Sequence, residues 1–436
     1  MSKFALLFLL VFFGGIFYAL FSSGFAAFVL YQLVYFLNPD NRWWSASIPG
    51  LRYSLITVAL MLFVYAVRFR QYNQLSPLRE QACFKWMALL LVLYHVASMY
   101  AVNPELHEKY AFDFTKLIVI MIVAYKVIDT RKAFDAVIWT YVLGAFYIGY
   151  LATITGRNSG DRVEGIGMID APDANDTAAA LVPAAVLLLY LAWQSGKYGR
   201  LAAVLMGGFI ANGLVLINSR GSFLGLVVSL GLYLMFMIFS RHQEKGQKKI
   251  AILMIVLGLG GAFSVTDDAF WERMSTIRSE NQAESGASRT VFWWRTFDML
   301  ADRPYGLGIF GYNALAPVYL SDEERGAAVH RAVHSSWFQG LSEVGYHGFI
   351  VFSLMLFALF RQSRHAKRYA IEGGDSRTYF KILALECALI GYMVAATFID
   401  RFRAEILYWM ILFLALAIKF HYLLPKEEQS SVLEKP

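Results

Sequence analysis

Long apolar runs make up most of this chain, and short polar segments separate them. Many of the runs are about 17 to 25 residues long, enough for a helix to cross roughly 30 Å of hydrocarbon. Because lipid cannot hydrogen-bond to the backbone, such runs are expected to satisfy their backbone groups within a helix. The pattern predicts an all-α, polytopic integral membrane helical bundle.

The runs predict 12 or 13 transmembrane helices. Only Ser22, Ser23 and Gly24 separate the first two runs, and no charge orients them, so the N-terminus could lie on either side. The candidate spans are residues 4–21, 25–36, 53–67, 83–99, 114–128, 134–153, 177–192, 201–216, 223–239, 250–263, 349–360, 380–398 and 406–422.

The basic residues predict the topology of these spans. The positive-inside rule assigns basic clusters to the cytoplasm, and here they alternate with lysine-poor segments. The clusters occupy residues 68–79, 126–132, 197–200, 241–249 and 361–377. Three polar segments are then expected on the other side of the membrane, at residues 156–176, 218–221 and 265–346.

Four parts follow from this topology. Residues 1–264 are expected to hold the N-terminal transmembrane helices, and residues 265–346 one large non-cytoplasmic loop domain that carries active-site residues. Residues 347–423 hold the C-terminal transmembrane helices, and residues 424–436 form a cytoplasmic tail.

Composition excludes a soluble globular protein, since 58% of the residues are hydrophobic and only 16% are charged. The net charge of +7 does not indicate a nucleic-acid partner, because the basic residues follow the membrane topology. Cys83 and Cys387 lie at or within apolar helices without a C-x-x-C spacing, so ordinary packing is expected for both. Membrane lipids are therefore expected around the chain, and nucleic acid is not.

The long loop carries its positive charge on arginine alone, with no lysine. Its arginines are Arg273, Arg278, Arg289, Arg295, Arg303, Arg325 and Arg331. The planar guanidinium suits two-point binding of phosphate or carboxylate, although exclusion of lysine from the outer face is an alternative explanation. Ser288 is expected to cap a helix whose first turn holds Arg289 and which ends before Pro304.

His334 is the candidate base at the end of this loop. A second helix is expected to start near it, with His334, Trp337, Phe338 and Leu341 on one face. A neutral imidazole there could take a proton from a sugar hydroxyl, whereas a purely structural histidine is the alternative. His330 and Arg331 lie one turn earlier and could support His334 or compete for its role.

Two further arginines lie in the other polar segments of the same side. Arg220 stands between two apolar helices, as either an interface anchor or a functional cation. Arg162 precedes Asn175 and Asp176, which are expected to cap the next helix.

Acidic residues in the long loop do not predict a metal site. The two groups are residues 267–268 and 322–324, and neither has a histidine at zinc-ligand spacing. Adjacent carboxylates at a loop edge are more typical of a solvated surface. No metal and no cofactor are expected.

Four sequence pieces together resemble the O-antigen ligase and polymerase superfamily of membrane glycosyltransferases. They are the Arg-Gly turn at Arg220, the Ser-Arg start of the helix at Arg289, the Pro-Tyr-Gly-Leu-Gly-Ile-Phe-Gly segment from Pro304, and the His-Ser-Ser-Trp…Glu-Val-Gly-Tyr-His-Gly segment from His334. The order and spacing of the pieces between the spans carry the resemblance. The family often has asparagine after the histidine, whereas Ser335 stands here.

The resemblance implies an O-antigen ligase of the bacterial inner membrane, with its active site facing the periplasm. The donor would be a glycan on undecaprenyl pyrophosphate, and the acceptor a sugar hydroxyl of lipid A-core. It implies inversion at the anomeric carbon without metal, with Arg220 and Arg289 stabilising the leaving pyrophosphate and His334 as base. Arg162, Arg295, His330 and Arg331 are the expected substrate-binding residues.

Two alternatives share parts of this pattern. An O-antigen polymerase or a protein O-oligosaccharyltransferase of the same fold would use the same leaving group. A lipid-linked-sugar transporter would place ionisable groups near the middle of the membrane, but the spans around Ala185, Ala203 and Val227 carry no charge. The polar chemistry gathers at one face, and this favours an enzyme.

Overall fold

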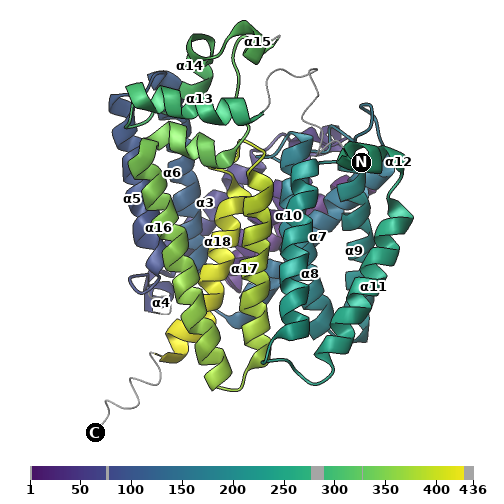
Figure 1. Cartoon of the computed structure of the whole chain (residues 1–436). Coiled ribbons are helices and arrows are strands. Elements are labelled where there is room, and N and C mark those ends of the chain that lie inside the picture. The colour runs from purple at the N-terminus through teal and green to yellow at the C-terminus, as the bar shows by residue number, and fades with distance from the viewer. Residues whose placement is uncertain (1, 75–77, 276–288, 327, 427–436) are drawn as a thin grey trace.

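The computed structural model describes residues 2–74, 78–275, 289–326 and 328–426, and it is helical throughout that part apart from turns and one isolated bridge between Ser159 and Arg162. The helices are α1 Lys3–Phe21, α2 Phe25–Leu37, α3 Tyr53–Val67, α4 Phe69–Gln74, α5 Ala82–Val96, α6 Pro104–Val127, α7 Arg131–Thr155, α8 Ala174–Gln194, α9 Lys197–Ile217, α10 Arg220–Phe239, α11 Gln247–Val265, α12 Asp268–Ser275, α13 Arg289–Asp302, α14 Gly311–Tyr319, α15 Asp322–Arg325, α16 Ser336–Glu372, α17 Ser376–Ala396 and α18 Glu405–Ile418. The predicted all-α polytopic class is confirmed (Figure 1).

Each of the predicted spans lies in a helix, but not all of these helices meet the requirements for crossing a membrane. Within the described part, 10 helices are long and apolar enough. Of the rest, α2 and α3 are shorter, at 13 and 15 residues. Helix α6 has 24 residues, but Asp113, Lys116 and Lys126 interrupt its apolar surface.

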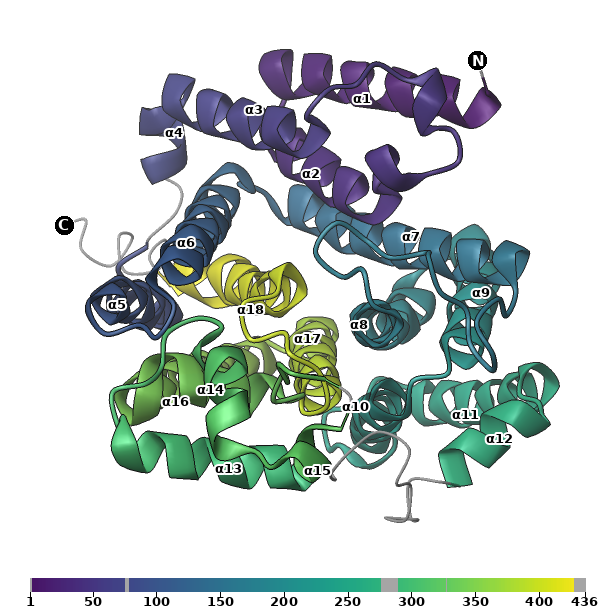
Figure 2. The ribbon, with the colours of Figure 1, turned by 90° about the horizontal axis from the view of Figure 1, so that it is seen from above.

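The interior of the bundle is built around α8, α17 and α18 (Figure 2). In the apolar window of α18, 89% of the residues are buried, and the value for α8 and α17 is 78%. Helix α11 is at the edge, where only 6% of its window is buried. An apolar helix with so little protein contact is suited to contact with lipid.

The helices α13, α14 and α15 lie across one end of the bundle, opposite the end at which α18 finishes (Figure 1). Trp293 of α13 stacks on Phe338 of α16, with ring centroids 5.3 Å apart. This contact holds α13 against the bundle. Ser288, the predicted cap of this helix, lies outside the described residues.

The glycine-rich segment after Pro304 docks onto a kink in α16. At the kink Gly345 has φ 64°, and a Cβ there would come within 2.5 Å of the Pro304 carbonyl oxygen. The Leu307 N–H donates to the Ser342 carbonyl (2.7 Å), and the Gly308 N–H donates to the Glu343 carbonyl (3.0 Å). Glycine is required at Gly345 by both the left-handed backbone and the close approach.

The predicted start of α16 needs correction. The helix begins at Ser336, and His334 has a left-handed backbone with φ 53°, so His334 lies in the preceding turn. It therefore does not share a helical face with Trp337, Phe338 and Leu341. A left-handed non-glycine residue is uncommon, and such residues concentrate at functional sites.

Gly345→Ala should destabilise the protein by about 2 kcal/mol or more, because alanine would be strained at this φ and would collide with the docked segment. Thermal unfolding of the detergent-purified protein measures the effect. Gly258→Ala on α11 is the matched control, since no atom lies within 4 Å of a Cβ at that position. Equal melting temperatures for the two variants would contradict the role assigned to the kink.

Candidate active site

The three predicted non-cytoplasmic segments meet at the loop-bearing end of the bundle. Asp161, between α7 and α8, accepts hydrogen bonds from Asn218 Nδ2 (3.2 Å) and from Arg273 Nη1 (2.9 Å). Arg157 forms an ion pair with Asp267. Residues from all three segments are thus joined, as expected for one site assembled from separate loops.

His334 lies at this end beside a carboxylate. Its Nδ1 is 3.4 Å from Oδ2 of Asp400, which belongs to the turn between α17 and α18. The other carboxylate oxygen of Asp400 accepts a hydrogen bond from the Ser335 N–H at 3.3 Å. The His334 side chain remains 39% exposed, so one part of the ring is held by protein while another is accessible.

The surroundings keep His334 uncharged. Burial lowers its pKa to about 4, and the positive charges of Arg289 and Arg331 act in the same direction. Burial raises the pKa of Asp400 to about 7. At neutral pH the imidazole can therefore accept a proton, while Asp400 is close to its titration midpoint.

The arginines near His334 form a cationic cluster. Arg289 begins α13, and its pKa is lowered by burial and then by the positive charges of Arg220 and Arg273. Arg220 begins α10, where helix N-terminal N–H groups add positive potential. Neighbouring guanidinium groups repel one another, and a bound anion would relieve this repulsion. A pyrophosphate is an anion of this kind.

Arg331 and Arg162, two predicted binding residues, have partners close to this cluster. Arg331 donates from Nε to the Arg325 carbonyl (2.6 Å), and its guanidinium lies 5.9 Å from the centroid of the Phe292 ring, a ring that also contacts His334. Arg162 donates from Nη2 to Asn175 Oδ1 at 3.0 Å.

Arg295 and His330 have partners within the loop domain instead. Arg295 forms ion pairs with Asp298 (3.0 Å) and Glu324 (2.7 Å). Nδ1 of His330 is 3.1 Å from the Asn313 carbonyl oxygen. These contacts favour a structural role, and substrate binding by either side chain stays a prediction.

Sequence reasoning missed Asp400 and its neighbours. The segment Asp-Arg-Phe-Arg-Ala-Glu at residues 400–405 places four charges in its six residues between two apolar spans. That density of charge at the end of a span was a usable signal, because charges at membrane depth are costly and need partners.

The side chains that could bind a metal ion are not gathered in the described part of the chain. Among the residues that the structure describes, no group of three or more His, Cys, Asp and Glu side chains is placed to hold a metal ion. The predicted cap of α8 is wrong, because Asn175 and Asp176 lie inside its first turn. The N-cap is Asp173, whose carboxylate accepts a hydrogen bond from the Asn175 N–H at 2.7 Å.

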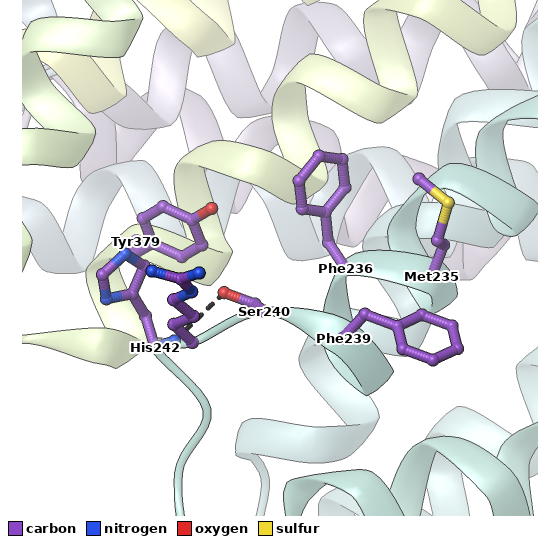
Figure 3. A pocket seen from close by; sticks show the side chains of 7 residues that line it. Met235, Phe236, Phe239, Ser240, His242 and Tyr379 are labelled. Atoms are coloured by element: carbon purple, nitrogen blue, oxygen red, sulfur yellow. Dashed lines mark hydrogen bonds between the residues drawn. The ribbon is translucent and has the colours of Figure 1, made fainter.

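A shallow pocket elsewhere in the molecule is separate from this site. It lies at the end of α10 opposite Arg220, and its lining residues are Met235, Phe236, Phe239, Ser240, Arg241, His242 and Tyr379 (Figure 3). The 20 residues of α10 separate the two places by about 30 Å.

Fold and site together define a multi-pass helical membrane protein with a cationic, histidine-bearing site at one end of its bundle. Residues 201–353 match the family model of O-antigen ligase, and the matched segment contains Arg220, Arg289 and His334. The match supports assignment to the O-antigen ligase family and confirms the resemblance that the sequence motifs indicated. No curated protein matches the chain.

Arg289→Gln should raise the pKa of His334 from about 4 toward its ordinary value, by about half a pH unit, because one of the cations that oppose protonation is removed. The pH dependence of diethyl pyrocarbonate labelling at His334, followed by peptide mass spectrometry, measures this pKa. Arg295→Gln is the control on the same helix, since Arg295 is neutralised by two carboxylates. A midpoint that moves equally in both variants would contradict the assigned cluster.

Proposed function

We propose that the protein is an O-antigen ligase-type glycosyltransferase of the bacterial inner membrane. It transfers a glycan from undecaprenyl pyrophosphate to a sugar hydroxyl of lipid A-core at the periplasmic face. The observation that carries the proposal is the neutral imidazole of His334 beside the cations of Arg220 and Arg289, all within the segment that matches O-antigen ligase.

The reaction is a single displacement with inversion. His334 takes the proton of the acceptor hydroxyl, whose oxygen attacks the anomeric carbon of the donor sugar as the bond to pyrophosphate breaks. The electron pair of that bond leaves with undecaprenyl pyrophosphate, and Arg220 and Arg289 stabilise its developing charge. Arginines thereby supply what a divalent ion supplies in other glycosyl transfers, so no metal is needed.

Asp400 has a distinct part in this scheme. When ionised, it accepts the Nδ1–H of His334, which leaves Nε2 unprotonated toward the acceptor. It also stabilises the imidazolium that forms as the proton is taken. Arg162, which donates to Asn175, and Arg331, which lies against the Phe292 ring, are the proposed contacts to further phosphate or saccharide groups of the substrates.

The acceptor distinguishes the proposed ligase from the related alternatives. A polymerase would give the glycan to a second lipid-linked glycan, and a protein O-oligosaccharyltransferase would give it to a protein. Reconstituted enzyme offered all three acceptors with one donor should glycosylate lipid A-core. Transfer to either of the other two would replace the ligase assignment with the corresponding activity.

His334→Ala and Arg220→Ala should each lower transfer by about 100-fold or more, because one removes the base and the other a charge that stabilises the leaving group. The assay follows glycan on lipid A-core with EDTA present, since the proposed reaction uses no metal. Arg303→Ala, in the same loop domain, is the control for loss of an arginine. Near-normal glycan transfer by a folded His334→Ala or Arg220→Ala variant would contradict the proposed mechanism.

The transfer rate should rise with pH, with a midpoint near 7. Burial raises the pKa of Asp400 to about 7, and only its ionised form orients His334, whereas His334 itself is already neutral well below that pH. The pH dependence of kcat between pH 5.5 and 8.5 measures this limb. Asp400→Asn should lower kcat and abolish its rise with pH. If the pH dependence of kcat is unchanged in this variant, another group is responsible for the rise.

A further inference from the structure

The turn that carries Asp400 is fixed to the first turn of α16. Ser336, the first residue of α16, donates from Oγ to the Ile399 carbonyl at 2.7 Å. The same Oγ accepts a hydrogen bond from the Arg401 N–H at 2.9 Å. One buried hydroxyl thus binds the backbone on both sides of Asp400, only two residues after His334.

The second turn of α16 continues this attachment. Gln339 Oε1 accepts a hydrogen bond from the Phe402 N–H at 3.0 Å. The Phe402 ring lies so close to Gly340 that a Cβ there would be 2.4 Å from it. Four residues of α16 at helical spacing therefore present one continuous face to the turn, namely Ser336, Gln339, Gly340 and Glu343.

Glu343 completes the face with a buried ion pair. Arg403 Nε and Nη2 donate to the two carboxylate oxygens of Glu343 at 3.0 and 3.1 Å. The Tyr94 hydroxyl and Gln339 Nε2 also donate to this carboxylate, at 2.6 and 3.1 Å. Glu343 is only 3% exposed, so both its charge and its hydrogen-bonding capacity are met within the protein.

A second ion pair fixes the opposite side of the same turn. Arg401 pairs with Asp176 of α8, and Asp170 lies 3.7 Å from the same guanidinium. Asp400 is thus followed directly by Arg401 and three residues later by Arg403, and the carboxylate partners of these arginines lie on α8 and α16. The turn cannot shift along α16 without breaking at least one of these pairs.

We propose that Glu343 and Arg403 are positioning residues that hold Asp400 against His334. The expected effect of these residues on the transfer rate rests on the proposed function, whereas their role in holding Asp400 near His334 does not. Buried ion pairs add little net stability compared with apolar packing, and one established use for them is to select a single arrangement. Here the selected arrangement is the approach of two segments separated by more than 60 residues of sequence.

The first test compares Glu343→Gln with wild type in the transfer assay, using purified full-length protein. Glutamine keeps the shape but loses the charge that holds Arg403, so kcat should fall by about 10-fold while KM for the lipid-linked donor changes less than about 2-fold. Arg403→Lys, which keeps the charge but loses the two-point contact, should retain an intermediate kcat.

The matched control is Glu386→Gln. Glu386 is likewise a buried carboxylate, on α17, and it pairs with Lys367 of α16 well beyond the kink at Gly345. Removing its charge should leave kcat within about 2-fold of wild type. An equal loss of kcat in both variants would indicate a general effect of unpairing a buried charge and would overturn the proposal.

The second test needs no activity. The protonation midpoint of His334 is followed by diethyl pyrocarbonate labelling in wild type, Glu343→Gln and Gln339→Ala. Release of the turn exposes the imidazole to water, so the midpoint should rise by about one pH unit. The other charged groups that act on His334, namely Arg289 of α13, Arg331, Asp173 before α8 and Asp400, are unchanged in these variants.

The two tests separate the positioning role from the proposed reaction. If wild type transfers no glycan but the midpoint rises in Glu343→Gln, the proposed function falls and the positioning role stands. If wild type is active and neither kcat nor the midpoint changes, the positioning role is wrong. Gln339→Ala serves where Glu343→Gln fails to fold, because it loosens the same turn without leaving a buried charge unpaired.

Discussion

The cost of placing charge inside an apolar bundle governs the loop-bearing end of this protein. Glu343 and Arg401 lie where water is scarce, and each is stabilised by a partner from a different helix. Because each partner comes from a distant part of the chain, satisfying the charges also fixes the loops. The ion pairs that neutralise these charges therefore also determine how the loops of the site are arranged.

The same scarcity of water sets the protonation states that the proposed reaction needs. His334 is neutral because burial and nearby cations oppose its protonation. Burial also raises the pKa of Asp400 to about 7, so the charge of this carboxyl changes with pH near neutrality. Arg289 and Arg220 remain cations despite mutual repulsion, which an anionic substrate would relieve. A base and an anion site can thus lie side by side without neutralising each other.

Some of the motif residues that carry the family resemblance serve the proposed reaction, and others hold the fold together. Arg220, Arg289 and His334 meet in the site, whereas Gly345 and the segment after Pro304 dock the loop domain onto the kink of α16. The docking uses backbone hydrogen bonds and close approach, so glycine is needed there for its lack of a side chain.

Sequence alone determined the all-helical membrane bundle, the end at which the polar chemistry gathers, and three candidate residues of the site. Those features depend on local composition and spacing, because a span is set by its own apolar length and a basic cluster by its own charge. Tertiary structure decided the partner of His334, the left-handed turn that presents it, and the separate contacts of Arg295 and His330. His334 and Asp400 are 66 residues apart, and no local pattern reports which distant carboxylate a folded chain brings to a given imidazole.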